Sequence, residues 1–469
     1  MRWIQRRTRQ PDAGTQRPRP PARLIGIAVL AAAAIGAGAL AAAGALGADG
    51  RPSGHHAALS PIRTTPGVHN GTTSPSPPGG GLTPVELRTA YNLGPLYKQG
   101  IDGAKQTIVI VDSFGSPTIA SDLDHFDSFF HLPSPPSFRV IQPAGKVPPY
   151  HASNSNRSGW AAETTLDVEW SHVMAPDASI VLVETPTSEN EGTTGFPQIV
   201  KAEKYALRHK LGQVISQSFA ATEQTFSPKS DYAAIRNLRG AYLLAYKDHV
   251  TVLSATGDDG VTSDKYNMVD EYTTPAVSWP ATDPLVTAVG GTQLNLRAGG
   301  ARKSPDVAWN DSGGGKSIVF GRPSYQNPVG GATGRHRGVP DISMDASCRS
   351  SVAIYGSFYG GQGGEWSPIC GTSLATPLFA GIVALTYQYA QQHGGHALGL
   401  INPALYKIEA RQERGVVDIT KGNNSQTVSN GGKSYIVNGF SAGPGYDLVT
   451  GVGTVDAANF VPELAKLAG

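Results

Sequence analysis

One serine stands where a nucleophile could be activated. The stretch CGTSLATPLFAG, residues 370–381, places Ser373 between a glycine and an apolar, helix-like run. Serine is a good helix cap and Pro377 suits a first helical turn, so one interpretation is purely structural. The other is a nucleophile at a helix N-terminus, where the helix dipole favours negative charge. This stretch alone does not decide between the two.

A pair of acids could supply the base that such a serine needs. In SGWAAETTLDVEWSHVM, residues 158–174, Ser158 can cap a helix that places Glu163 and Asp167 on one face. That face also carries large apolar side chains, which should be buried, whereas Glu169 lies away from it. The apolar members are Trp160, Trp170 and Met174. Two carboxyls held together in a poorly solvated place share a proton, an arrangement that is usually functional; the structural alternative is a solvated acidic pair.

A third acid follows a strand-like run. The stretch VTVLSATGDDGV, residues 250–261, places Asp258 directly after a buried-strand pattern, between Gly257 and Asp259. A Gly-Asp turn is common and would explain the pattern without any chemistry. The functional hypothesis is a catalytic carboxyl, because such groups gather beyond the carboxyl ends of parallel strands.

The elements that must position these residues alternate between strands and helices. Short apolar runs predict buried parallel strands over residues 106–112, 178–184, 212–219 and 250–256. Between them, helices are predicted over residues 160–173, 198–209 and 229–246, and after Ser373 a helix runs to a Gly-rich end at 394–395. The alternation predicts an α/β fold with a mostly parallel central sheet flanked by helices, with residues 82–469 as a single domain.

The basic residues concentrate at the start of the chain. Residues 1–81 hold nine Arg and two Asp but no Lys or Glu, a charge of +7, and the whole chain carries +2, which leaves −5 for residues 82–469. Nothing in this balance indicates nucleic-acid binding. Residues 1–48 form a basic segment followed by an uncharged Ala/Gly-rich stretch over 24–47, which is either a cleaved signal peptide or a membrane anchor. Both place the remainder outside the cell, secreted or anchored to the outer face of the cytoplasmic membrane.

A Pro/Gly-rich segment and a pair of cysteines are two further features of the chain. Residues 49–81 are rich in Pro, Gly, Ser and Thr and predict a disordered tether. The chain has only two cysteines, Cys348 and Cys370, which usually pair in an exported protein; the alternative is two buried free thiols.

The motifs together resemble a family. The stretch GTSLATPLFAG is similar to the nucleophile motif of subtilisin-type peptidases, but the His-Gly-Thr of their base is absent from the chain. The chain instead resembles the sedolisins, serine-carboxyl peptidases that share the subtilisin fold and use Glu in place of His. The resemblance covers residues 82–469 and is carried, in the family's order, by ETTLDVEW, MAPDASIVLVE, SATGDDG, WPATDPLVTAVGGT, GVPDISMDA, CGTSLATPLFAG, VVDITKGNN and GPGYDLVTGVG.

The resemblance implies roles for individual residues. Ser373 matches the nucleophile, Glu163 the general base, Asp167 the acid that orients and tunes that base, and Asp258 the acid that stabilises the oxyanion. Glu163 would take the Ser373 proton and return it to the leaving amine, and Asp258 would donate only while protonated, which predicts work at acidic pH. The family's calcium site matches a set of carboxylate and carbonyl oxygens, namely Asp418, Ile419, Gly443, Gly445 and Asp447.

The chain also departs from the family pattern. Where relatives carry a folded propeptide, only the tether is present here, and Phe219 and Ala220 stand where Trp and Gly are common. Asp112 could serve the network behind the acid pair. We therefore expect a monomeric, exported, calcium-binding serine-carboxyl endopeptidase that acts on proteins or peptides. The alternatives are a subtilisin-type enzyme with an unrecognised His and a non-catalytic surface binding protein on the same fold.

Overall fold

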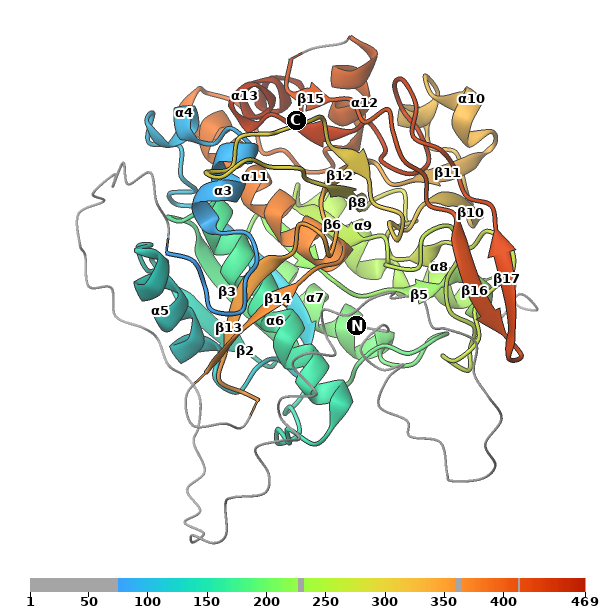
Figure 1. Ribbon diagram of the computed structural model, residues 1–469, viewed down its shortest axis with the longest axis horizontal. Helices are drawn as coiled ribbons and strands as arrows, with labels where there is room; N and C mark the ends of the chain where they lie inside the picture. The colour runs from blue at the N-terminus through green and yellow to red at the C-terminus, as the bar shows by residue number, and fades with distance from the viewer. Residues whose placement is uncertain (1–74, 227–231, 360–363, 412–413, 469) are drawn as a thin grey trace, which may run out of the picture.

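A parallel sheet forms the centre of the computed structural model, which describes residues 75–226, 232–359, 364–411 and 414–468 (Figure 1). Its strands run in the order β12-β8-β6-β4-β1-β3-β2, all parallel, with the short strand β9 antiparallel to β8. They are β1 (Thr107–Ser113), β2 (Phe138–Ile141), β3 (Ser179–Thr185), β4 (Val214–Gln217), β6 (Thr251–Ala255), β8 (Thr287–Gln293), β9 (Val307–Ala308) and β12 (Ile342–Asp345). The predicted α/β fold and all four predicted strands are confirmed.

Alternate residues of each strand enter two different hydrophobic cores. In β1, Ile108 and Ile110 belong to the core on one face of the sheet, and Val109 and Val111 to the core on the other. Because both faces are covered, the strand is apolar at almost every position, as is typical of a parallel sheet between helices. The uninterrupted apolar run in the sequence therefore has a direct structural cause.

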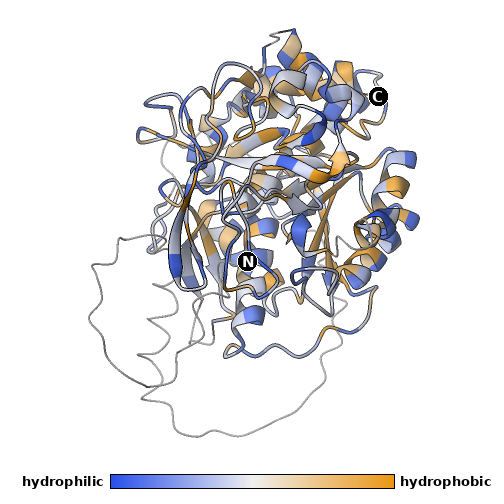
Figure 2. Cartoon of the chain, turned by 90° about the vertical axis from the view of Figure 1, so that its right-hand side faces the viewer, coloured by the Kyte–Doolittle hydropathy of each residue, from blue (hydrophilic) through white to orange (hydrophobic). Residues whose placement is uncertain are grey.

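Helices cover both faces of the sheet. The long helices α6 (Ser155–Met174) and α11 (Thr372–Gln392) pack against each other and against one face, and α7 (Phe196–Arg208) and α9 (Gly240–Lys247) cover the other. Hydrophobic residues gather on the strands and the inner sides of the helices, and hydrophilic ones on loops and outer helix surfaces (Figure 2). The arrangement places the carboxyl ends of β1, β3, β4 and β6 along one edge of the sheet.

Shorter elements complete the domain. The helices are α3 (Pro84–Ala90), α4 (Gly94–Tyr97), α5 (Ile119–Phe130), α8 (Ala233–Leu238), α10 (Gly330–Thr333), α12 (Asn402–Ala410) and α13 (Ala457–Leu467), with 3-10 turns η2 (Glu223–Thr225) and η4 (Ser324–Gln326). Antiparallel pairs form between β5 (Ala221–Thr222) and β7 (Ser278–Trp279), β10 (Gly315–Gly321) and β11 (His336–Val339), β13 (Val352–Gly356) and β14 (Glu365–Ile369), β15 (Val416–Val417) and β18 (Thr454–Val455), and β16 (Gln426–Asn430) and β17 (Lys433–Val437).

Two details of the predicted helices were wrong, and one helix is buried on more sides than its apolar stripe predicted. Helix α6 begins at Ser155 with Asn154 as its cap, so Ser158 lies inside it. The helix is buried on all sides from residue 159 to residue 174. Glu169, which lies away from the predicted stripe, is also fully buried, because the β13–β14 hairpin covers that side. Its carboxylate accepts a hydrogen bond from the Tyr355 amide. The helix predicted over 229–246 is two helices, α8 and α9.

The predicted leader, residues 1–48, lies outside the described residues, as does the tether up to residue 74. The last residues assigned to the tether, 75–81, are described, and Pro77 is buried. Among the described helices, none is long and apolar enough to span a membrane. The predicted span over residues 24–47 lies outside that search.

Candidate active site

Ser373 lies at the start of α11, as the helix-terminus hypothesis requires. It is the second residue of the helix and 7% exposed. Pro377 is the sixth helical residue, not part of the first turn. Since proline has no N–H, the helix offers the Ser373 carbonyl no i+4 donor, and the Ser218 hydroxyl donates to that carbonyl instead, at 3.5 Å.

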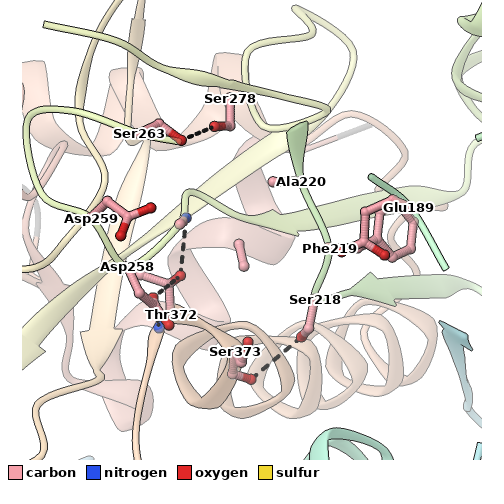
Figure 3. Close-up of a pocket in the computed structure, with 12 residues that line it drawn as sticks. Glu189, Ser218, Phe219, Ala220, Asp258, Asp259, Ser263, Ser278, Thr372 and Ser373 are labelled. Carbon is pink, nitrogen blue, oxygen red and sulfur yellow. Dashed lines mark hydrogen bonds between the residues drawn. The ribbon is translucent and has the colours of Figure 1, made fainter. Parts of the chain in front are cut away.

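Ser218 also joins this helix to the acid pair. It follows β4 directly, and its hydroxyl lies 3.2 Å from Oδ1 of Asp167. The hydroxyls of Ser218 and Ser373 lie close enough to Glu163 to lower the pKa of its carboxyl. Both predicted acids of α6 are therefore next to the predicted nucleophile, and Ser218 contacts all three residues (Figure 3 shows Ser218 and Ser373).

The two acids are held in a nearly dry environment. Glu163 is 2% exposed and Asp167 is fully buried. Burial raises the pKa of Glu163 and, more strongly, that of Asp167; the charge of Asp112 raises the Asp167 pKa further, while hydrogen bonds from Ser218 lower both. The raised pKa values agree with the proton sharing expected of this pair.

Asp112 extends the acid pair toward β3. It is 1% exposed, and neither of its carboxylate oxygens has a hydrogen-bond partner among the described residues. Burial raises its pKa well above the usual range, and the charges of Glu163 and Glu184 raise it further. Glu184 stands at the same register position on β3, where Gln142 donates to its carboxylate at 2.8 Å.

Asp258 lies on the other side of Ser373, three residues beyond the end of β6. Its Oδ1 accepts hydrogen bonds from the amide and hydroxyl of Thr372, at 2.8 and 2.7 Å (Figure 3). Oδ2 receives none from the described residues and lies beside Gly371, where a Cβ atom would come within 2.6 Å of it. Gly371 also has φ of 132°, so glycine is required there on both grounds.

A small cleft of about 50 Å³ opens beside Ser373. Its wall includes Asp258 and Ser218, with Phe219 and Ala220, the two departures from the family pattern, next to them (Figure 3). Its other members are Glu189, Ala255, Gly257, Asp259, Ser263, Ser278 and Thr372. No histidine lines the cleft among the described residues, so nothing there supplies the base of a subtilisin-type triad.

The two cysteines form a disulfide beside the nucleophile loop, as predicted. The Cα atoms of Cys348 and Cys370 are 4.9 Å apart, and Cys370 lies three residues before Ser373. The bond joins the segment after β12 to the start of α11.

Removing this disulfide should destabilise the fold. For a sequence separation of 22, loop-closure entropy gives roughly 3 kcal/mol of stabilisation. We expect a Cys348→Ser, Cys370→Ser double variant to unfold at lower denaturant concentration than its parent, with both carrying Ser373→Ala to prevent self-digestion. Reducing the parent should reproduce the shift, and equal midpoints for parent and variant would contradict the prediction.

The predicted calcium ligands come from two segments that meet. The amide of Gly445 donates to Asp418 at 3.0 Å, and that of Gly443 to Asp447 at 3.1 Å. Ile419 is buried beside them. The described residues hold no cluster of three or more His, Cys, Asp or Glu side chains suited to a metal. Two carboxylates therefore fit a hard cation only if backbone carbonyls supply the other ligands.

Sequence reasoning missed Ser218 and Thr372. The sequence signal for Thr372 was its place in Gly-Thr-Ser, directly before Ser373. The structure shows that its amide and hydroxyl both donate to Asp258. The signal for Ser218 was its position at the end of a predicted strand, on the edge where the other site residues gather. Serine and threonine are common in strands and helix caps, so only their contacts in the structure indicate a role in the site.

Known proteins decide the family. The model of the subtilase family matches residues 152–413, more than half of the chain and a span that contains all four predicted catalytic residues. The chain belongs to the subtilase family. Kumamolisin from Bacillus sp. (strain MN-32) is 30% identical over 387 residues, covering 79% of this subtilase and 61% of kumamolisin. Sedolisin from Pseudomonas sp. (strain 101) is 28% identical over 388 residues, covering 81% of this chain and 60% of sedolisin.

A solved structure agrees with these relatives. Pseudomonas sedolisin, a serine-carboxyl proteinase complexed with two molecules of pseudo-iodotyrostatin, superposes with a TM-score of 0.67 at 26% identity, covering 84% of this chain and 99% of that one. This subtilase therefore has the sedolisin form of the fold. It spans about three fifths of the length of the curated relatives it matches.

Proposed function

We propose that this subtilase is a serine-carboxyl peptidase that hydrolyses peptide bonds in acid. The observation that carries the proposal is the position of the Ser373 hydroxyl beside a buried carboxyl, Glu163. The neighbouring acid, Asp167, accepts a hydrogen bond from the Ser218 hydroxyl. The names of the relatives support it, since kumamolisin and sedolisin match across most of the described domain. Substrates are proteins or peptides bound in the cleft beside Ser373.

Acylation would proceed in two proton steps. Glu163 accepts the Ser373 proton as the hydroxyl oxygen attacks the substrate carbonyl carbon, and the carbonyl oxygen becomes an oxyanion. Glu163 then gives that proton to the leaving amine as the peptide bond breaks, which leaves an acyl-serine. In the second half of the reaction Glu163 takes a proton from water as the water oxygen attacks the acyl carbon. Glu163 then gives that proton to the Ser373 oxygen as the ester bond breaks, which releases the acid product and restores Ser373.

Asp258 would stabilise the oxyanion as a neutral acid. Its Oδ1 already accepts two hydrogen bonds from Thr372, so a proton on the carboxyl would sit on Oδ2, the oxygen without a partner among the described residues. Such a donor aimed at developing charge is the usual device of acyl transfer. Because a carboxylate cannot donate, this role requires the protonated form of Asp258.

The proposal is tested by digestion of an unfolded protein at pH 4. We expect the full chain to cleave it and Ser373→Ala to leave it intact. A folded wild-type chain that yields no fragments would contradict the proposal and favour a binding protein on the same fold.

We further propose that Asp418 and Asp447, with the carbonyls of Ile419, Gly443 and Gly445, hold Ca²⁺. The cation would tie the loop of Asp418 to that of Asp447, a structural role. In this proposal the ion takes no part in bond cleavage.

Calcium removal should lower stability. An ion that binds only the native state adds about 2.7 kcal/mol at a hundredfold excess over its Kd. We expect chelator to lower the melting temperature of the Ser373→Ala chain at pH 5 and added Ca²⁺ to restore it. An unchanged melting temperature, with no metal in the purified protein, would remove the calcium site from the account.

A further inference from the structure

A second cleft, of about 380 Å³, lies outside the Ser373 site. Three segments distant in sequence form it: the start of α3 with Leu82 and Glu86, the turn 293–298 after β8, and Arg349 with Ser350 after β12. None of these residues lines the cleft beside Ser373. The function proposed above makes no use of this second cleft.

Two guanidinium groups dominate the charge of this cleft. Arg297 and Arg349 are exposed, and neither side chain has an ion pair or hydrogen bond with any described residue. The one carboxylate in the wall, Glu86, already accepts hydrogen bonds from the amide and hydroxyl of Thr83, both at 2.9 Å. The cleft is therefore positive within a domain whose net charge is negative.

The backbone that carries the two arginines is held in place. The amide of Arg297 donates to the carbonyl of Ala301 at 2.8 Å, which closes the turn after β8. On the other side, the Ser350 hydroxyl donates to Asp345 and accepts from the Leu294 amide at 3.2 Å, which joins the two segments. The guanidinium groups thus extend from two segments of the wall whose backbone is held by hydrogen bonds.

We propose that this cleft binds an oxyanion, a carboxylate or phosphate group, between Arg297 and Arg349. Each guanidinium presents parallel N–H donors that match two oxygens of such a group and stays charged in acid. The amide nitrogen of Gln293 adds a neutral donor in the wall, because its Oε1 already accepts from the Ser347 hydroxyl at 3.3 Å. Arg349 directly follows Cys348 in sequence, so this wall of the cleft belongs to the segment that the disulfide joins to the loop of Ser373.

Calorimetric titration of the full-length Ser373→Ala chain tests the proposal. The probes are inorganic phosphate, acetyl-dialanine with its free carboxylate, and acetyl-dialanine amide, which lacks the charge. We expect phosphate or the free dipeptide to bind and the amide not to. Binding of phosphate alone assigns the cleft to phosphate groups, and binding of the dipeptide assigns it to peptide carboxyl termini.

Three matched variants locate the binding. Loss of one charged hydrogen-bonding partner should weaken affinity about tenfold or more in both Arg297→Gln and Arg349→Gln. Arg139→Gln, at an exposed arginine on β2 without a described partner, should bind as the parent does. Absence of binding by both anions, or equal affinity in all three variants, would overturn the proposal.

Discussion

Glu163→Gln is expected to lower kcat by about 10²- to 10⁴-fold while the protein stays folded. Glutamine has nearly the same shape but cannot accept the Ser373 proton, so attack on the substrate loses its base. Ser373→Ala should lower kcat further, by at least about 10⁴-fold, because the covalent route disappears. Initial rates on one peptide at pH 4, with circular dichroism as the check on folding, measure both effects.

The matched control for this prediction is on the same helix. Glu169 is fully buried like Glu163, but it accepts its hydrogen bond from the Tyr355 amide under the β13–β14 hairpin. Gln can still accept that bond, so Glu169→Gln should keep turnover within about threefold. A folded Glu163→Gln protein with wild-type turnover would remove Glu163 from the mechanism.

The second large effect concerns stability above acidic pH. Glu203 on α7 is 1% exposed, and neither carboxylate oxygen has a hydrogen-bond partner among the described residues. Burial raises its pKa to about 8, against a small opposing effect of Lys204. The native state therefore holds a proton that the unfolded state releases near pH 4.5, and stability falls as pH rises between the two pKa values.

Glu203→Gln should remove most of this loss. A native pKa near 8 corresponds to about 3 kcal/mol of stability lost by the parent between pH 4.5 and pH 7. We expect denaturant melts, in the Ser373→Ala background, to show Glu203→Gln more stable than the parent at pH 7 and within about 1 kcal/mol of it at pH 4.5.

Glu223 provides the contrasting case. It is also buried, but the Ser317 hydroxyl and the Ile318 amide donate to its carboxylate at 2.6 and 2.7 Å. Glutamine has one acceptor oxygen in place of two, so Glu223→Gln should destabilise the protein at both pH values. A Glu203→Gln variant with the pH dependence of its parent would show that Glu203 does not hold its proton at neutral pH.

Spacing and hydrophobicity predicted much of the framework. The four strands that surround the site read as apolar runs because helices cover both faces of the sheet. The spacing of four between Glu163 and Asp167, on a stripe with Trp170, predicted two buried acids on one side of a helix. Within the described residues these inferences needed only local pattern, and α6 and the four strands agree with them.

Other features depend on tertiary contacts that no local pattern contains. Pro377 leaves the Ser373 carbonyl without a helical donor, but only the fold shows that Ser218, 155 residues away in sequence, takes its place. Glu169 lies away from the stripe of Glu163 and Asp167, and its burial depends on a hairpin that lies far along the chain. The cleft between Arg297 and Arg349 likewise arises where three distant segments meet.

The pH dependence of kcat/KM for one peptide tests the carboxyl mechanism most directly. The account predicts a maximum in acid and a decline toward pH 7, because Asp258 must keep its proton to donate to the oxyanion and the Glu163–Asp167 pair must retain one proton. Rates are measured from pH 3 to pH 8 on samples shown to be folded at each pH. Hydrolysis that is fastest at pH 8 would contradict the account and indicate a different base.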